Sequence, residues 1–100
     1  MNQITSKENK GIKEYVKLAK SRSFREETGW FALETVKLLQ EALQSGVEIL
    51  RLYVTPALLD AHPELVEQAQ ASGAECSLIS QELEGKMSQT GNSRGCFAIC

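Results

Sequence analysis

The residues that could bind a metal or attack a substrate are three cysteines and one histidine in a chain of 100 residues. A structural zinc site needs four ligands, usually including closely spaced cysteines. Cys96 and Cys100 fall on a predicted strand, which separates them by roughly 13 Å along one face. They are therefore predicted to be buried free thiols, with no metal. His62 precedes Pro63 at a predicted helix start, where a surface position is favoured over a general base because no motif places a nucleophile beside it.

Glycine-rich phosphate loops are the next chemistry to consider. Neither G-x-x-x-x-G-K-[ST] nor G-x-G-x-x-G occurs. Residues 91–95 are flanked by glycines, but they precede a predicted strand, whereas a phosphate loop leads into a helix amino terminus. A tight turn is predicted there instead. No nucleophile elbow, HExxH motif or paired-carboxylate pattern is present, so the chain is predicted to hold no cofactor and to have no activity by itself.

The charge is divided unevenly along the chain. Residues 1–25 have a net charge of +5 and residues 26–100 a net charge of −7, although the whole chain is close to neutral at −2. A basic arm on an acidic body is typical of proteins that bind nucleic acid. Charge alone is equally compatible with an ordinary solvated helix face.

A predicted helix aligns several of these basic residues on one side. Apolar residues recur with the i, i+3, i+4, i+7 spacing of an amphipathic helix at Ile12, Tyr15, Val16 and Ala19. Lys13, Lys17 and Lys20 share the opposite side and form a stripe, which can follow a phosphate backbone better than scattered lysines can.

Strands and helices alternate along the rest of the chain. Strands are predicted at residues 30–33, 48–54, 75–79 and 96–100, and further helices at 36–43, 63–69 and 80–87, with a turn at 88–95. The strand at residues 30–33 is expected to be buried. Such alternation predicts one α/β domain over residues 1–100: a three-layer α/β/α sandwich around a small, mainly parallel or mixed sheet.

The sequence also bears on location. The amino terminus lacks the apolar run of a secretory signal, and no apolar stretch approaches the about 20 residues that span a bilayer. Three cysteines cannot all pair within one chain, which favours a reducing cytoplasmic setting without membrane contact. Because the chain ends inside an apolar strand, we expect it to be part of a longer protein.

Several short segments stand in a specific order along almost the whole chain. They are Ile4-Thr5-Ser6-Lys7-Glu8-Asn9, Ile12-Lys13, Lys20-Ser21-Arg22-Ser23-Phe24-Arg25, Gly29-Trp30-Phe31-Ala32-Leu33-Glu34, Glu41-Ala42, Tyr53-Val54-Thr55, Lys86-Met87-Ser88-Gln89-Thr90 and Gly95-Cys96-Phe97-Ala98-Ile99. In this order they resemble the amino-terminal substrate-binding domain of the SpoU/TrmH-type RNA 2′-O-ribose methyltransferases.

The resemblance implies a fold and a function. The family's domain is similar to the ribosomal and kink-turn RNA-binding α/β/α sandwich, and a knotted domain that binds S-adenosylmethionine and transfers the methyl group follows it. That catalytic domain is absent from this chain. The resemblance implies ribosomal RNA of the large subunit, or less often transfer RNA, as substrate, and a parent enzyme that is a homodimer through the missing domain.

The resemblance and the basic arm together predict the RNA contacts. Asn9 and Lys13 match the family's N-P-x-I-K segment, and Arg25 matches an arginine before its first strand. The full set of predicted RNA-binding residues is Lys7, Asn9, Lys10, Lys13, Lys17, Arg22, Phe24, Arg25 and Arg94. Phe24 is included as an exposed ring on which a base could stack.

Ordinary structural roles compete with some of these assignments. Asn9 is a good helix N-cap, and Arg25 has Glu26 and Glu27 beside it as ion-pair partners. Glu34 and Gly95 match the family's F-x-x-E-G and P-Q-G motifs, and Glu34 is expected to act as a structural hydrogen-bond acceptor.

The chain also departs from the family's pattern. Lys10 replaces a proline, and Ser93-Arg94 stands in place of Pro-Gln. Thr35 replaces the glycine after Glu34, so a close approach of another backbone or of RNA is not expected there.

Two other functions remain open. The first is a free-standing kink-turn binder, although the G-x-N-E stretch usual in such proteins is missing. The second is a protein-interaction domain that pairs methyltransferase subunits, which the acidic body would suit.

Overall fold

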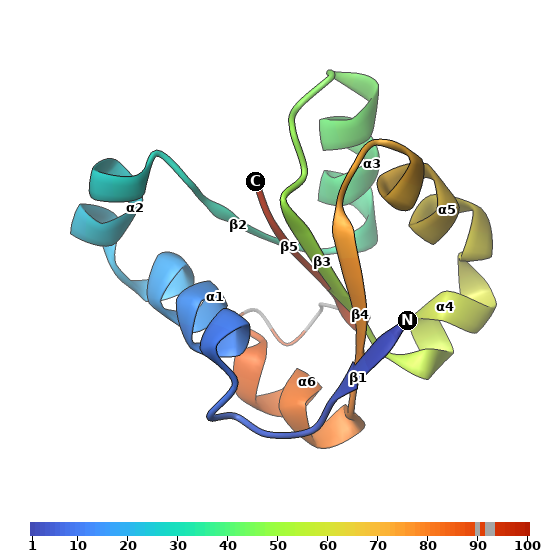
Figure 1. The fold of residues 1–100 in the computed structure, drawn as a ribbon, viewed down its shortest axis with the longest axis horizontal. Helices are drawn as coiled ribbons and strands as arrows, with labels where there is room; N and C mark the ends of the chain where they lie inside the picture. The colour runs from blue at the N-terminus through green and yellow to red at the C-terminus, as the bar shows by residue number, and fades with distance from the viewer. Residues whose placement is uncertain (90, 92–93) are drawn as a thin grey trace.

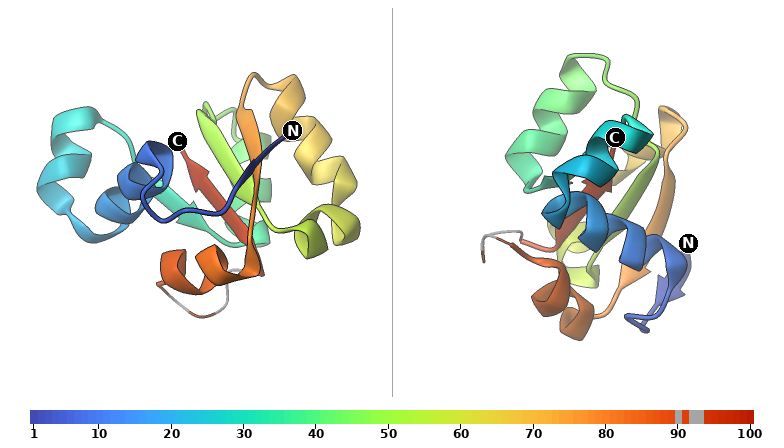
Figure 2. Two further views of the ribbon diagram at one scale, coloured as in Figure 1. Left: turned by 60° about the horizontal axis from the view of Figure 1, so that its bottom comes forward. Right: turned by 90° about the vertical axis from the view of Figure 1, so that its left-hand side faces the viewer.

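A five-stranded sheet lies between two layers of helices in the computed structural model, which describes residues 1–89, 91 and 94–100 (Figure 1). The predicted three-layer α/β/α sandwich is confirmed. In chain order the elements are β1 (Asn2–Ile4), α1 (Lys10–Lys20), α2 (Arg22–Thr28), β2 (Ala32–Glu34), α3 (Val36–Gln44), β3 (Arg51–Val54), α4 (Pro56–Ala61), α5 (Pro63–Ala71), β4 (Glu75–Ile79), α6 (Gln81–Met87) and β5 (Cys96–Ile99). Figure 2 shows the same layers from two further directions.

The sheet is mixed. Its strand order is β1-β4-β3-β5-β2, with β1, β4 and β3 parallel and β5 antiparallel to both of its neighbours. A crossover through α4 and α5 joins β3 to β4, as parallel neighbours require. The predicted strand at residues 48–54 is confirmed as the central strand, although its ladder begins only at Arg51.

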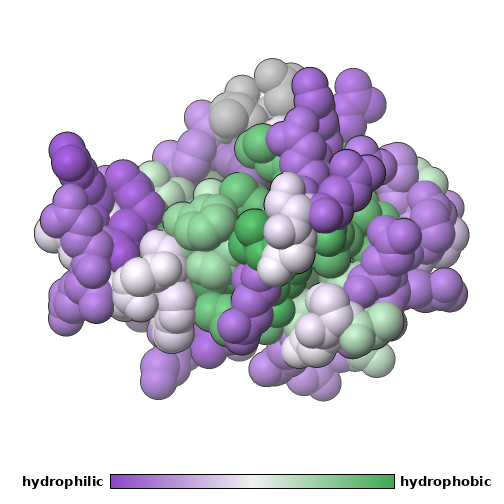
Figure 3. Space-filling view, turned by 90° about the horizontal axis from the view of Figure 1, so that it is seen from above, coloured by the Kyte–Doolittle hydropathy of each residue, from purple (hydrophilic) through white to green (hydrophobic). Residues whose placement is uncertain are grey.

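Alternation along the strands sends side chains into two separate cores. On one face Leu52 and Val54 of β3 and Cys96 and Ala98 of β5 pack against α3, α4 and α5. On the other face Tyr53, Phe97 and Ile99 pack against α1 and α6. Figure 3 looks onto one end of the molecule, where hydrophobic residues lie in the centre and hydrophilic residues surround them.

Three short elements were not predicted: β1, α2 and α4. Each is short, and none has the apolar periodicity that reveals longer elements. Caps define the two helices instead. The Ser21 hydroxyl accepts a hydrogen bond from the Phe24 amide at the start of α2, and the Thr55 hydroxyl accepts one from the Leu58 amide at the start of α4.

The predicted buried strand at residues 30–33 was wrong in its bounds and in its burial. The strand is Ala32–Glu34, and it lies at the edge of the sheet, where it pairs only with β5. Trp30 is half-buried and Phe31 is 40% exposed. The hydrophobic composition suggested burial. A strand at the edge of a sheet has a neighbouring strand on one side only, which leaves its other side open to solvent.

The three cysteines are free. Burial raises the pKa of the Cys96 thiol to about 12 and that of Cys100 to about 11. Within the described part of the chain, no cluster of three or more histidine, cysteine or acidic side chains could hold a metal. No helix among the described residues is long and apolar enough to cross a membrane.

Thr35 keeps a backbone conformation that normally belongs to glycine. Its φ is 135° and its ψ is 152°, and its hydroxyl accepts a hydrogen bond from the Leu38 amide to cap α3. A side chain with a branched β-carbon is strained there by about 1–3 kcal/mol. Thr35 thus holds a conformation that glycine would adopt without this strain.

Thr35→Gly is expected to raise the free energy of unfolding by about 1 kcal/mol, because the relief of strain exceeds the few tenths lost when glycine replaces a capping threonine. Ser80→Gly is the matched control, because Ser80 caps α6 from an ordinary φ of −74°. That variant is expected to be destabilised. Urea denaturation of both variants measures the two effects, and a loss of stability in Thr35→Gly would contradict the strain at this residue.

Candidate functional site

Helix α1 separates two hollows on the surface. Its start is fixed by Asn9, whose side-chain oxygen accepts hydrogen bonds from the amides of Gly11 at 2.9 Å and Ile12 at 3.3 Å. The capping role considered for Asn9 is thus present. The buried face of α1 is formed by Ile12, Tyr15 and Leu18, which leaves its lysines outward.

The first hollow, which we call the lysine groove, runs between α1 and α6 and has a volume of about 330 Å³. Its lining residues are Lys7, Ile12, Lys13, Val16, Lys17, Lys86 and Met87. Ile12 and Met87 are buried and Val16 is half-buried, so the floor is apolar. The four lysines around it come from two regions that are far apart in sequence, residues 7–17 and the helix α6.

Among the described residues, the ammonium groups of these lysines have only weak partners. Lys13 pairs with Glu8 at 2.7 Å, and Lys86 pairs with Glu82 at 3.3 Å. The hydrogen bond and charge of Lys13 lower the pKa of Glu8. These ion pairs are solvent-exposed, and exposed pairs contribute little stability. An anion could therefore replace the glutamates at small cost.

The structure brings together only some of the predicted contact residues. Lys7, Lys13 and Lys17 line the lysine groove, and Asn9 and Lys10 line the second hollow on the other side of α1. Arg94, exposed just before β5, lines neither. The turn predicted at residues 88–95 includes Thr90, Asn92 and Ser93, which lie outside the described residues.

The three candidates in α2 differ in availability. Arg22 is exposed and pairs with Glu26 at 3.0 Å. Arg25 is half-buried, and its guanidinium donates a hydrogen bond to the Leu18 carbonyl oxygen at 2.6 Å instead of pairing with a glutamate.

The expectation that Phe24 is an exposed stacking ring was wrong. Phe24 is half-buried and packs against the core on the α1 face, and the Lys17 ammonium lies 4.3 Å from its ring centre. The helix α2 turns this ring inward, and the sequence did not reveal that helix.

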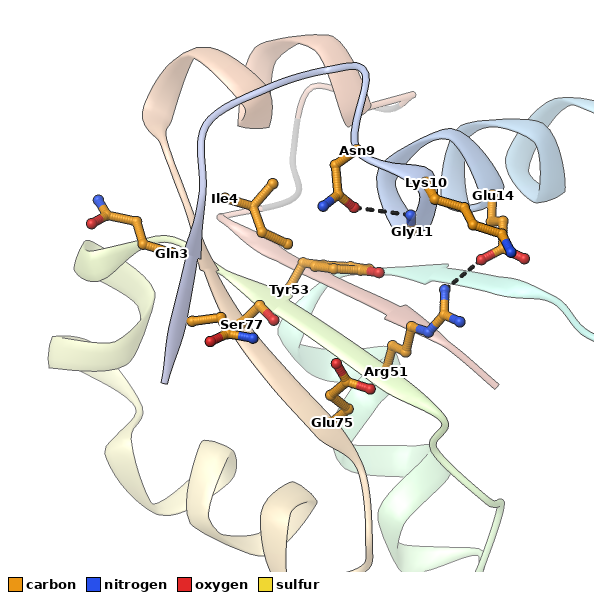
Figure 4. Close-up of a pocket in the computed structure, with 11 residues that line it drawn as sticks. Gln3, Ile4, Asn9, Lys10, Gly11, Glu14, Arg51, Tyr53, Glu75 and Ser77 are labelled. Carbon is orange, nitrogen blue, oxygen red and sulfur yellow. Dashed lines mark hydrogen bonds and ion pairs between the residues drawn. The ribbon is translucent and has the colours of Figure 1, made fainter.

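The second hollow, which we call the polar cleft, was missed from the sequence (Figure 4). It has a volume of about 410 Å³ and opens onto the sheet beside α1. Arg51 of β3 forms an ion pair with Glu14 of α1 across it. That hydrogen bond raises the pKa of Arg51, while burial raises the pKa of Tyr53 next to it. Polar residues alternating along β3 and β4 were the available signal.

Glu34 has the structural role that was expected of it. Its buried carboxylate accepts hydrogen bonds from the Ser88 hydroxyl and the Gln89 amide, both at 2.7 Å. The edge strand β2 is thereby tied to the segment after α6. At the same end of the sheet, the Thr55 amide donates a hydrogen bond to the Gly95 carbonyl oxygen at 3.1 Å.

Comparison with known families gives one match. Residues 9–98 match the family described as the MRM3-like substrate binding domain. No curated protein matches the sequence significantly.

Solved structures with the same fold include two of an rRNA methyltransferase from Sinorhizobium meliloti, one of them bound to AdoMet. Their TM-scores are 0.80 and 0.79, each at 21% identity over 98% of this chain. A structure of an RNA 2′-O ribose methyltransferase matches 97% of this chain with a TM-score of 0.73 and 26% identity. This chain spans only 35–36% of the length of these proteins.

Proposed function

The chain belongs to the family of MRM3-like substrate binding domains, and on that premise we propose that it binds RNA for a 2′-O-ribose methyltransferase. The substrate proposed is ribosomal RNA of the large subunit. The chemistry would reside outside this chain, in a domain that binds S-adenosylmethionine and pairs two subunits. The AdoMet-bound structure of the Sinorhizobium meliloti rRNA methyltransferase, much longer than this chain, supports S-adenosylmethionine as the cofactor of the longer protein.

The lysine groove is the observation that carries the proposal. Four ammonium groups surround an apolar floor between two helices. Lysines attract a phosphate backbone from any direction because each is a flexible point charge. The apolar floor suits the sugars and base faces that lie between phosphates. A small acidic ligand would use the charges but not the floor.

Contact with the four lysines of the groove gives a specific salt dependence. With about 3–4 phosphates neutralised, log K for single-stranded RNA is expected to fall against log salt with a slope of roughly −2 to −3. Fluorescence anisotropy of a labelled ribosomal RNA fragment between low and moderate salt measures it. Binding that is absent, or independent of salt, would overturn the proposed function.

A further inference from the structure

The polar cleft is built by the register of two parallel strands. Arg51 pairs with Glu75, and Tyr53 pairs with Ser77, so these four side chains emerge on the same face of the sheet. Neighbouring positions on β5 are the apolar Phe97 and Ile99, which lie in the core beneath the helices. The polar part of this face is left open beside α1 and is closed on its far side by β1.

The walls of the cleft are held in fixed positions. Tyr53 is 3% exposed and Ser77 is 4% exposed, yet both line the opening. Gly11 lets α1 come this close, because a β-carbon at that position would lie 2.2 Å from the Tyr53 hydroxyl oxygen. Glu14 anchors the Arg51 guanidinium from the helix side. A site whose polar groups are held in this way is preorganised for a ligand.

The charges of the cleft indicate a neutral ligand. Lys10 and Arg51 supply two positive charges, and Glu14 and Glu75 supply two negative ones. An isolated phosphate would meet both carboxylates and is disfavoured. The Glu75 carboxylate is exposed and forms no ion pair with any residue in the described part of the chain.

We infer that the polar cleft binds one unpaired nucleobase of the RNA, and that it prefers guanine. The inference rests on the proposed function, since it needs an RNA on the neighbouring surface. The volume of the polar cleft falls within the about 300–1,000 Å³ typical of small-ligand pockets. Guanine places two adjacent N–H donors beside a carbonyl acceptor. A carboxylate such as Glu75 accepts from the donors, and a cation such as Lys10 donates to the acceptor.

The position of the cleft fits an RNA lying in the lysine groove. Lys10 lines the cleft and Lys13 lines the groove, and residues three apart are neighbours on a helix surface. An RNA strand whose phosphates contact the lysine groove can therefore direct one base over the first turn of α1 and into the polar cleft. The phosphates contribute affinity and the cleft contributes sequence preference.

The test compares two short single-stranded RNAs, a uridine pentamer with a central guanosine and the same pentamer with a central adenosine. The native chain is expected to bind the guanosine RNA about tenfold more tightly. Glu75→Gln is expected to bind the two within about twofold of each other, because a glutamine amide cannot accept both N–H groups of guanine. Glu67→Gln on α5, also exposed, is the matched control and is expected to keep the native preference.

The outcomes separate the two proposals. If the native chain binds both RNAs equally and with the expected salt dependence, the guanine cleft is wrong and the proposed function stands. A preference that survives in Glu75→Gln also overturns the assignment to this cleft. If neither these RNAs nor a ribosomal RNA fragment binds, the proposed function itself fails. Thermal melts of both variants check that each is folded.

Discussion

Gly95→Ala is expected to lower the free energy of unfolding by about 3 kcal/mol, the largest stability change predicted for this chain. Two costs add. Gly95 has a φ of +79°, where an alanine costs roughly 1–2 kcal/mol. Its β-carbon would also lie 2.2 Å from the Thr55 hydroxyl oxygen and 2.9 Å from the Thr55 methyl carbon. Crowding of this kind in a packed site costs about 1–3 kcal/mol.

Gly29→Ala separates the two costs. Gly29 also has a positive φ, +74°, but a β-carbon there meets no atom within 4 Å. In this control the free energy of unfolding is expected to fall only by the cost of the positive φ, about 1 kcal/mol. Chemical denaturation of both variants gives the difference. Equal losses would show that Thr55 can move away at no cost and that the close contact at Gly95 is unimportant.

The largest functional effect is expected from neutralising the lysine groove. Lys13→Gln, Lys17→Gln and Lys86→Gln made together should weaken RNA binding at least tenfold at moderate salt, because up to three phosphate contacts are lost. All three lysines are exposed, so stability should change by no more than about 0.5 kcal/mol per site. Anisotropy titrations with one RNA measure the affinity, and thermal melts check the fold.

A matched control changes the charge by the same amount elsewhere. Gln40→Glu, Gln44→Glu and Gln68→Glu also lower the net charge by three, on exposed positions of α3 and α5. If the groove is the site, this variant should lose much less affinity than the lysine variant. Equal losses in the two variants would mean that binding follows net charge and that the groove has no special role.

The sequence predicted the elements that carry a strong period or a clear boundary. The helix α5 begins at Pro63 as expected, and β4 has the bounds that were predicted. The helix α6 begins after Ser80, whose hydroxyl accepts a hydrogen bond from the Leu83 amide. Pro63 in the first turn of α5 and the Ser80 cap of α6 mark where these helices begin, so local sequence and tertiary structure agree on both boundaries.

Short elements were not predicted from the sequence because tertiary packing defines them. The strand β1 is three residues long, and only its pairing with β4 makes it a strand. The helix α2 buries no residue fully, so it has no apolar face to detect. Missing α2 led directly to the wrong exposure for Phe24. A helix that was not predicted thus led to a wrong prediction for a candidate RNA-binding residue.

The candidate site was predicted in part for the same reason. The lysine stripe lies on one helix, and its period places Lys13 and Lys17 together. Lys86 joins them only because α6 packs beside α1, and helix packing is not readable from one sequence. The polar cleft needs four elements in register, so Glu14, Arg51 and Ser77 were not singled out from the sequence.

The salt dependence of the lysine-groove variant tests the central claim most directly, because the slope of log K against log salt counts phosphate contacts. Removal of three contacting lysines should reduce the steepness of the native slope by about 2. The glutamine-to-glutamate control should keep the native slope. The account predicts a nearly flat salt dependence for the variant with Lys13, Lys17 and Lys86 replaced. A slope unchanged from the native chain would contradict it, because the RNA would then contact phosphate-binding residues elsewhere.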